Sequence, residues 1–87
     1  MTPTESQIQD WIVARVSALA ELPPEQVDVA APLARLGLDS VALVTLAFDL
    51  EKWLGYRFRS NPLNDHPTIA ALSRFLAQQA ADVKPAG

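Results

Sequence analysis

The sequence predicts an all-α domain: a small bundle of three main helices plus one short helix, with a long ordered loop between the first two main helices. Three observations support this prediction. Apolar residues recur every three or four positions along three segments, prolines and glycines separate those segments, and no segment alternates as a strand does. With 87 residues, 49% of them hydrophobic, the chain has material for one domain and one core.

The composition excludes several kinds of function. Without cysteine there is no disulfide, zinc–thiolate site, iron–sulfur cluster or thiol nucleophile, and the lone His66 cannot form a multi-histidine site, so we predict no metal. A net charge of −3 argues against nucleic-acid binding. No apolar run has the length of a membrane span, and no signal peptide opens the chain. We therefore expect a soluble, cytoplasmic monomer with no nucleic-acid or membrane partner.

The first helix is predicted over residues 5–20. Its inward positions follow the helical period, and they are Ile8, Ile12, Val16 and Leu19. Thr4 is a suitable N-cap, and Leu22-Pro23-Pro24 ends the helix because proline cannot continue it. Residues 21–39 follow as a loop whose apolar residues indicate that it packs on the core. Within it, Pro24–Gln26 is predicted to form one helical turn.

The second main helix is predicted over residues 40–54, with Gly55 as its C-terminal cap and either Asp39 or Ser40 as its N-cap. A short segment around residues 62–66 and a final helix over about residues 68–80 complete the fold. We expect the domain to span residues 1–82 and residues 83–87 to form a flexible C-terminal tail.

The 40–54 helix carries two apolar stripes, although a surface helix needs only one to join a core. One stripe is formed by Leu43, Leu46, Ala47, Leu50 and Leu54, and the other, nearly opposite, by Val41, Val44 and Phe48. The second stripe is covered by the loop or the short segment, or it is a docking face for partner proteins. The two interpretations are compatible if Phe48 lies inside and the two valines lie at the rim.

The turn that leads into this helix reads Leu36-Gly37-Leu38-Asp39-Ser40. Taken alone, it is explained by a glycine turn followed by a well-capped helix. The wider context is more specific, because residues 36–44 read LGLDSVALV, Ala31-Pro32-Leu33 precedes them, and residues 65–76 read DHPTIAALSRFL. On these residues the chain resembles the acyl carrier protein family, including the carrier domains of polyketide and peptide synthases. The resemblance covers about residues 5–80.

This resemblance implies that Ser40 carries 4′-phosphopantetheine, attached by a phosphopantetheinyl transferase, with Gly37, Leu38 and Asp39 around the attachment point. It implies a non-catalytic carrier that holds acyl groups as thioesters and presents them to ketosynthases, acyltransferases or related synthase enzymes. It places partner contacts on the second stripe. The residues assigned to docking are Val41, Val44, Phe48, Asp39 and Glu51.

The chain departs from the carriers of dissociated fatty-acid synthesis in its charge. Ala42 and Thr45 stand where acidic residues are frequent in such carriers, so electrostatic steering by this helix should be weak. This departure favours a polyketide-like or specialised fatty-acid pathway. Arg57 and Arg59, in the following loop, are interpreted as solvated charges or as contacts to partners or to the cofactor phosphate.

Other singled-out residues have structural interpretations. Trp11 and Trp53 are predicted to be half-buried anchors, and His66 to have a structural or capping role. Leu46, Phe48 and Leu72 are interpreted as core residues or as the lining of a chain-holding cavity.

Three alternative functions can be compared with the sequence. A serine hydrolase is excluded, because the chain has no G-x-S-x-G elbow and His66 is the only candidate base. A peptidyl or aminoacyl carrier remains open, since the motif identifies the arm and not its cargo. A helical adaptor that binds partners through Val41, Val44 and Phe48 without modification also remains open.

Overall fold

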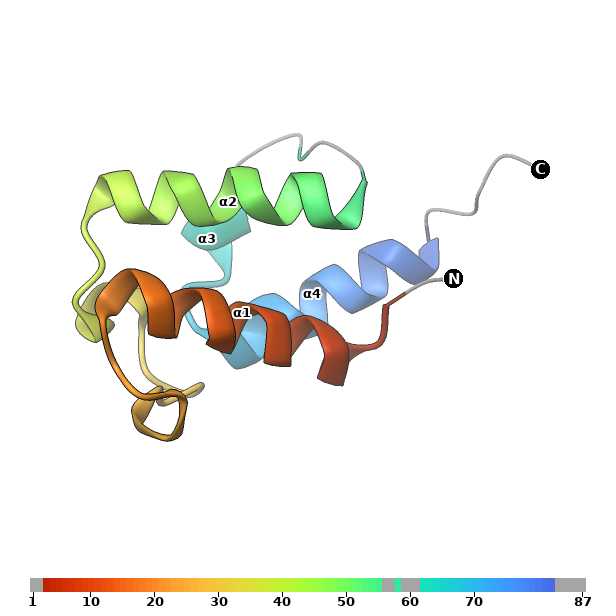
Figure 1. Cartoon of the computed structure of the whole chain (residues 1–87). Coiled ribbons are helices and arrows are strands. Elements are labelled where there is room, and N and C mark those ends of the chain that lie inside the picture. Colours follow the sequence, from red (N-terminus) through yellow and green to blue (C-terminus); the bar gives the residue numbers. More distant parts are fainter. Residues whose placement is uncertain (1–2, 56–57, 59–61, 83–87) are drawn as a thin grey trace.

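The computed structural model describes residues 3–55, 58 and 62–82, so the predicted tail and the two loop arginines, Arg57 and Arg59, lie outside it. Three main helices and one short helix form a small bundle (Figure 1). This confirms the predicted architecture. The elements, with two 3₁₀ turns labelled η, are α1 (Glu5–Ala20), η1 (Pro24–Gln26), η2 (Leu33–Leu36), α2 (Ser40–Leu54), α3 (Pro62–Asp65) and α4 (Ile69–Asp82).

Helix α1 begins and ends with local signals. The Thr4 side chain accepts a hydrogen bond from the Gln7 N–H (3.1 Å), and the Gln7 side chain accepts one from the Thr4 N–H (2.9 Å), a reciprocal capping box. The helix ends before the two prolines, at Glu21, whose backbone is left-handed (φ 57°) and whose N–H donates to the Ser17 carbonyl. The predicted bounds of this helix are therefore confirmed.

The loop between α1 and α2 is held by backbone hydrogen bonds to the start of α4. The Leu33 N–H donates to the Pro67 carbonyl (2.7 Å), and the Ala70 N–H donates to the Val29 carbonyl (3.0 Å). Val27 and Leu33 are buried, so the loop also contributes to the core. The segment is an ordered loop, as predicted, because both its backbone and its apolar side chains have partners within the domain.

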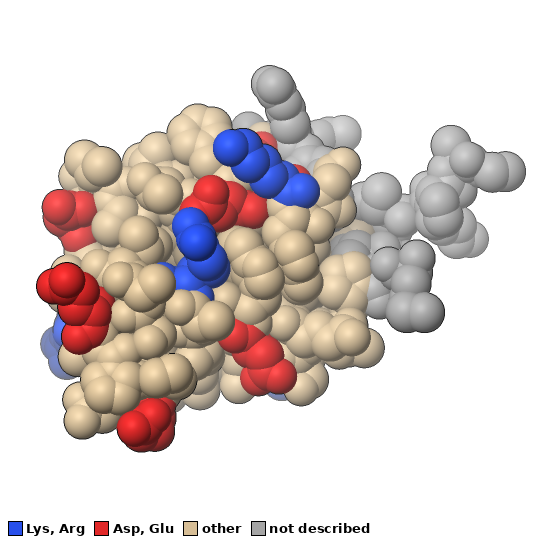
Figure 2. Space-filling model, viewed as in Figure 1, with Lys and Arg blue, Asp and Glu red and all other residues tan. Residues whose placement is uncertain are grey.

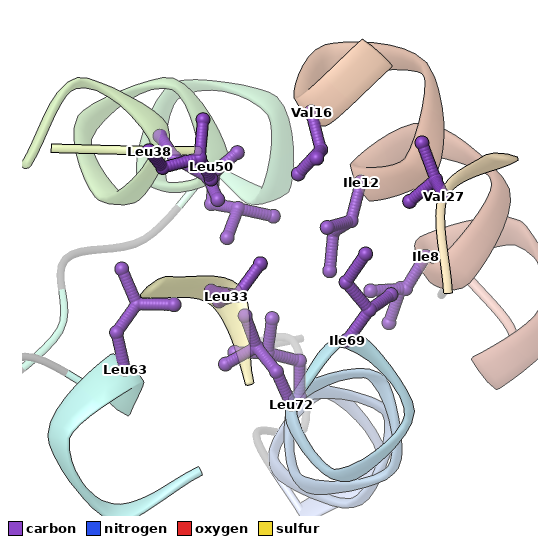
Figure 3. Close-up of a cluster of buried hydrophobic side chains, with 12 residues drawn as sticks. Ile8, Ile12, Val16, Val27, Leu33, Leu38, Leu50, Leu63, Ile69 and Leu72 are labelled. Carbon is purple, nitrogen blue, oxygen red and sulfur yellow. The ribbon is translucent and has the colours of Figure 1, made fainter. Parts of the chain in front are cut away.

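The core lies where the four helices and this loop meet (Figure 3). Leu33 projects between α2 and α4, while Leu63 reaches the same cluster from α3 (Figure 3). Side chains from all four helices and the loop contribute, and the buried hydrophobic residues are Ile8, Ile12, Val16, Val27, Leu33, Leu38, Leu46, Leu50, Leu63, Ile69, Leu72 and Leu76. The inward stripe of α2 predicted from periodicity is thus confirmed at its centre.

Aromatic stacking and an ion pair join α1 to α2. The rings of Trp11 and Trp53 are stacked, with centroids 5.1 Å apart and planes 14° apart. The Arg15 guanidinium carbon lies 5.9 Å from the Trp11 ring centroid, and Arg15 forms an ion pair with Asp49 of α2. Both tryptophans are partly exposed, as expected of half-buried anchors.

The last two helices are joined at His66. Its N–H donates to the Pro62 carbonyl (2.9 Å), and its ring stacks on Phe75, with centroids 4.2 Å apart, which supports the predicted structural role. Helix α4 begins one residue later than expected, because Thr68 is its cap and accepts from the Ala71 N–H (3.1 Å). Among the described residues, no helix has the length and apolar character needed to span a membrane.

Candidate functional site

At the centre of the turn before α2, the backbone has a conformation that only glycine adopts without strain. Gly37 has φ +87°, in the left-handed region, and a Cβ added there would meet no atom within 4 Å. The requirement for glycine is therefore conformational and not steric. Leu38 then points inward and is 6% exposed, which anchors the turn to the core beside the start of α2.

Asp39, and not Ser40, caps α2. The Asp39 carboxylate accepts a hydrogen bond from the Ala42 N–H (2.7 Å), and the Asp39 carbonyl accepts the first helical hydrogen bond from the Leu43 N–H (3.0 Å). Ser40 is consequently the first helical residue, with an exposed side chain. Its hydroxyl is not needed for capping and is accessible from solvent.

The backbone at the start of α2 favours a phosphate, whereas the charge of the neighbouring Asp39 carboxylate opposes one. In a helix, the N–H groups of the first turn lack intrahelical carbonyl partners, and the helix dipole is positive at this end. Asp39 accepts a hydrogen bond from the Ala42 N–H. Ser40 and Val41 precede Ala42 in the first turn of α2, where backbone N–H groups have no intrahelical partner and can bind an anion. Within the described ranges, no group of acidic or histidine side chains is arranged to hold a metal ion.

Three exposed apolar side chains follow Ser40 along α2, and we call them the apolar α2 face: Val41, Val44 and Phe48. They are 71%, 47% and 59% exposed, respectively. Neither the loop nor α3 buries them, so the interpretation that placed Phe48 inside is wrong. The reason is geometric: the opposite stripe, centred on Leu46 and Leu50, already faces the core.

Comparison with known proteins identifies the family. The model of the family described as "Phosphopantetheine attachment site" matches residues 10–76, most of the chain. The chain belongs to this family. It is therefore a carrier protein of the kind that attaches 4′-phosphopantetheine, and proteins of this family are generally non-catalytic.

Individual relatives of this carrier protein are acyl and peptidyl carriers. It is 32% identical over 76 residues to the acyl carrier protein TtuC of Teredinibacter turnerae, covering 87% of each chain. It is 26% identical over 80 residues to a phenolphthiocerol/phthiocerol polyketide synthase of Mycobacterium tuberculosis, a much longer chain of which it covers only 4%. A free-standing peptidyl carrier protein from Acinetobacter baumannii superimposes with a TM-score of 0.80 at 26% identity, covering 87% of this chain and 95% of that one.

Among the described residues, the three that the sequence suggested as the lining of a chain-holding cavity do not share one environment. Leu46 and Leu72 are fully buried in the core, whereas Phe48 is on the surface. A surface cavity of about 480 Å³ does occur, and its lining includes Glu5, Ala30, Arg74 and Phe75, with no residue from α2.

Each of the two acidic side chains within α2 of the carrier protein interacts with another residue of the same chain. Asp49 pairs with Arg15 of α1, and the Glu51 carboxylate accepts a hydrogen bond from the Phe58 N–H (2.7 Å). Sequence reasoning assigned Glu51 to docking and missed both contacts. No sequence signal reveals the Asp49 contact, because its partner lies 34 positions away along the chain.

Two substitutions of Asp39 in the carrier protein separate the effect of its capping hydrogen bond from the effect of its charge. Asp39→Ala is expected to lower the free energy of unfolding by about 1 kcal/mol, because the Ala42 N–H loses its partner. Asp39→Asn should retain most of the stability, because asparagine caps about as well as aspartate. Urea unfolding of the three proteins measures both effects. Equal losses in the two variants would contradict the capping role.

Proposed function

We propose that Ser40 is the attachment point for 4′-phosphopantetheine. The observation that supports this most directly is the exposed Ser40 hydroxyl at the start of α2, free of the capping role that Asp39 fills. In the reaction, the Ser40 Oγ–phosphorus bond forms and the pyrophosphate bond of coenzyme A breaks. The leaving group is 3′,5′-adenosine bisphosphate, and the hydroxyl proton passes to a base of the phosphopantetheinyl transferase.

The loaded protein would carry acyl groups as thioesters on the terminal thiol of the arm, which explains why the chain needs no cysteine of its own. Tethering makes each delivery partly intramolecular once the carrier has docked. The similarity to an acyl carrier protein and to a polyketide synthase supports an acyl cargo and a polyketide-like or specialised fatty-acid pathway. The partners would be a ketosynthase, an acyltransferase or related synthase enzymes.

Docking is assigned to the apolar α2 face, with Asp39 and Glu51 at its two ends. The exposure of Val41, Val44 and Phe48 supports this assignment, because contiguous exposed apolar side chains mark interaction sites. The face begins one residue after Ser40, so a partner that covers it also reaches the attachment point.

Val44→Asp tests the docking role. Its side chain is 47% exposed, so the helical circular dichroism should remain while a charge is placed inside the interface. Loss of about 2 kcal/mol of binding, typical of a central contact, corresponds to about a thirty-fold lower kcat/KM for loading by the transferase. Ala14→Asp, which adds the same charge at an exposed position of α1, should load normally. Unfolding of Val44→Asp would instead assign the side chain to the core.

A peptidyl or aminoacyl carrier is the second candidate. It is supported by the similarity to the free-standing peptidyl carrier protein, whose chain matches nearly end to end. The mass of the species isolated from cells distinguishes the two, because an aminoacyl or peptidyl thioester and a ketoacyl or fatty thioester differ in composition.

Loading itself tests the proposal against the unmodified adaptor. Incubation with coenzyme A and a broad-specificity transferase should add one phosphopantetheine, detected by intact mass. Fragmentation of the modified peptide should place it on Ser40. A protein that stays unmodified with several such transferases would be an adaptor that uses the apolar α2 face only.

A further inference from the structure

The docking helix has no charge along its first nine residues. Residues 40–48 read SVALVTLAF, without an acidic or basic side chain. The apolar α2 face lies entirely within this stretch, at Val41, Val44 and Phe48. A partner that covers the face therefore meets apolar side chains, small side chains and the Thr45 hydroxyl, with Ser40 or its attached arm at the edge.

The acidic residues farther along α2 do not restore a negative surface. The Asp49 side chain is 24% exposed, and its charge is paired with that of Arg15. The two residues are 34 positions apart, so the sequence gives no sign of this ion pair. Glu51 directs its carboxylate to the Phe58 N–H, at 2.7 Å. Lys52, in the last turn, is exposed and has the opposite sign. The tertiary structure thus makes the helix less acidic toward a partner than its composition indicates.

Charges around the helix start are also mixed. Asp39 is exposed beside Ser40, and one of its carboxylate oxygens accepts a hydrogen bond from the Ala42 N–H. Arg35, which has the opposite charge, is exposed in η2, just before the turn. On the side of the molecule seen in Figure 2, blue and red side chains are interspersed and neither forms a continuous patch. No single sign of charge dominates the described surroundings of Ser40.

From these observations, we propose that the enzymes which dock on α2 present an apolar contact surface that lacks a basic cluster. The inference rests on the proposed function, since it describes the partner of the same face. A basic cluster pressed against residues 41–48 would lose water without gaining a counter-charge from that stretch, which is unfavourable. An apolar surface removes Val41, Val44 and Phe48 from water, which is favourable in proportion to the area covered.

The test compares two phosphopantetheinyl transferases of known structure, one with an apolar carrier-binding surface and one with a basic surface. Loading of Ser40 is followed by intact mass, and kcat/KM is measured from about 0.1 M to about 1 M NaCl, over which the Debye length shortens from about 10 Å to about 3 Å. Wild type should load at least about ten-fold faster with the apolar-surfaced enzyme, with less than about a two-fold change across the salt range.

A variant with two added negative charges on α2 tests the opposite case, in which a basic-surfaced enzyme should be favoured. Ala42→Glu/Thr45→Glu should raise kcat/KM with the basic-surfaced enzyme by about ten-fold at low salt, and high salt should remove the gain. Glutamate at position 42 suits the third helical position after the Asp39 cap. Because Ala42 is partly buried against the core, circular dichroism verifies that the variant folds. Ala42→Gln/Thr45→Gln is the uncharged control of equal size and should show no gain.

The outcomes separate this inference from the proposed function. Efficient loading of wild type by the basic-surfaced enzyme, with a steep loss of rate in high salt, would overturn the apolar-partner inference and leave Ser40 as the attachment point. Failure of both enzymes to load wild type would overturn the proposed function and this inference with it.

Discussion

Ser40→Ala is expected to abolish loading by any phosphopantetheinyl transferase while leaving the fold unchanged. The variant removes the oxygen that would form the phosphodiester, so no slower reaction at that position remains. Because Asp39 supplies the cap and Ser40 is exposed, the free energy of unfolding should change by no more than about 0.5 kcal/mol. Intact mass after incubation with coenzyme A and transferase measures the loss, and circular dichroism verifies the fold.

The matched control is a second exposed serine in the first turn of a helix. Ser6 is the second residue of α1, after the Thr4 cap, and like Ser40 it is exposed in the first turn of a helix. It lacks the glycine turn and the apolar α2 face. Ser6→Ala should therefore gain one phosphopantetheine as wild type does. A mass gain in Ser40→Ala would assign the arm to another hydroxyl.

Leu46→Ala is expected to cause a large loss of stability. Leu46 is fully buried where α2 faces the core, so alanine removes apolar contacts and leaves a cavity. Leucine-to-alanine changes of this type cost about 2–5 kcal/mol. Globular domains have only about 0.05–0.15 kcal/mol of stability per residue, so the loss is a large share of the total for a chain of 87 residues.

Phe48→Ala is the comparison on the same helix. It removes a larger side chain, but one that is 59% exposed, so the free energy of unfolding should fall by less than about 1 kcal/mol. Urea unfolding of both variants provides the test. If Phe48→Ala costs as much as Leu46→Ala, the apolar α2 face is part of the core and its docking role is lost.

Most of the fold follows from local signals that can be read along the chain. The first main helix begins after Thr4 and ends before the two prolines that follow Leu22, and the second ends at Gly55, all as predicted. These signals can be read from the sequence because caps and helix breakers act on neighbouring backbone groups. The two stripes of α2 follow from the 3.6-residue period alone. Asp39-Ser40 likewise indicates a helix start, although the cap itself was ambiguous, since both side chains accept hydrogen bonds from a first turn.

By itself, the sequence determined the helical class, the bounds of the first two main helices and the position of Ser40 at the start of the second. Only the tertiary structure decided that Phe48 lies outside, that Asp39 is the cap, and that Asp49 and Glu51 are bound internally. The physical reason is distance along the chain. Periodicity and capping involve residues within a turn of one another, whereas exposure and ion pairing depend on which remote segments pack against a side chain.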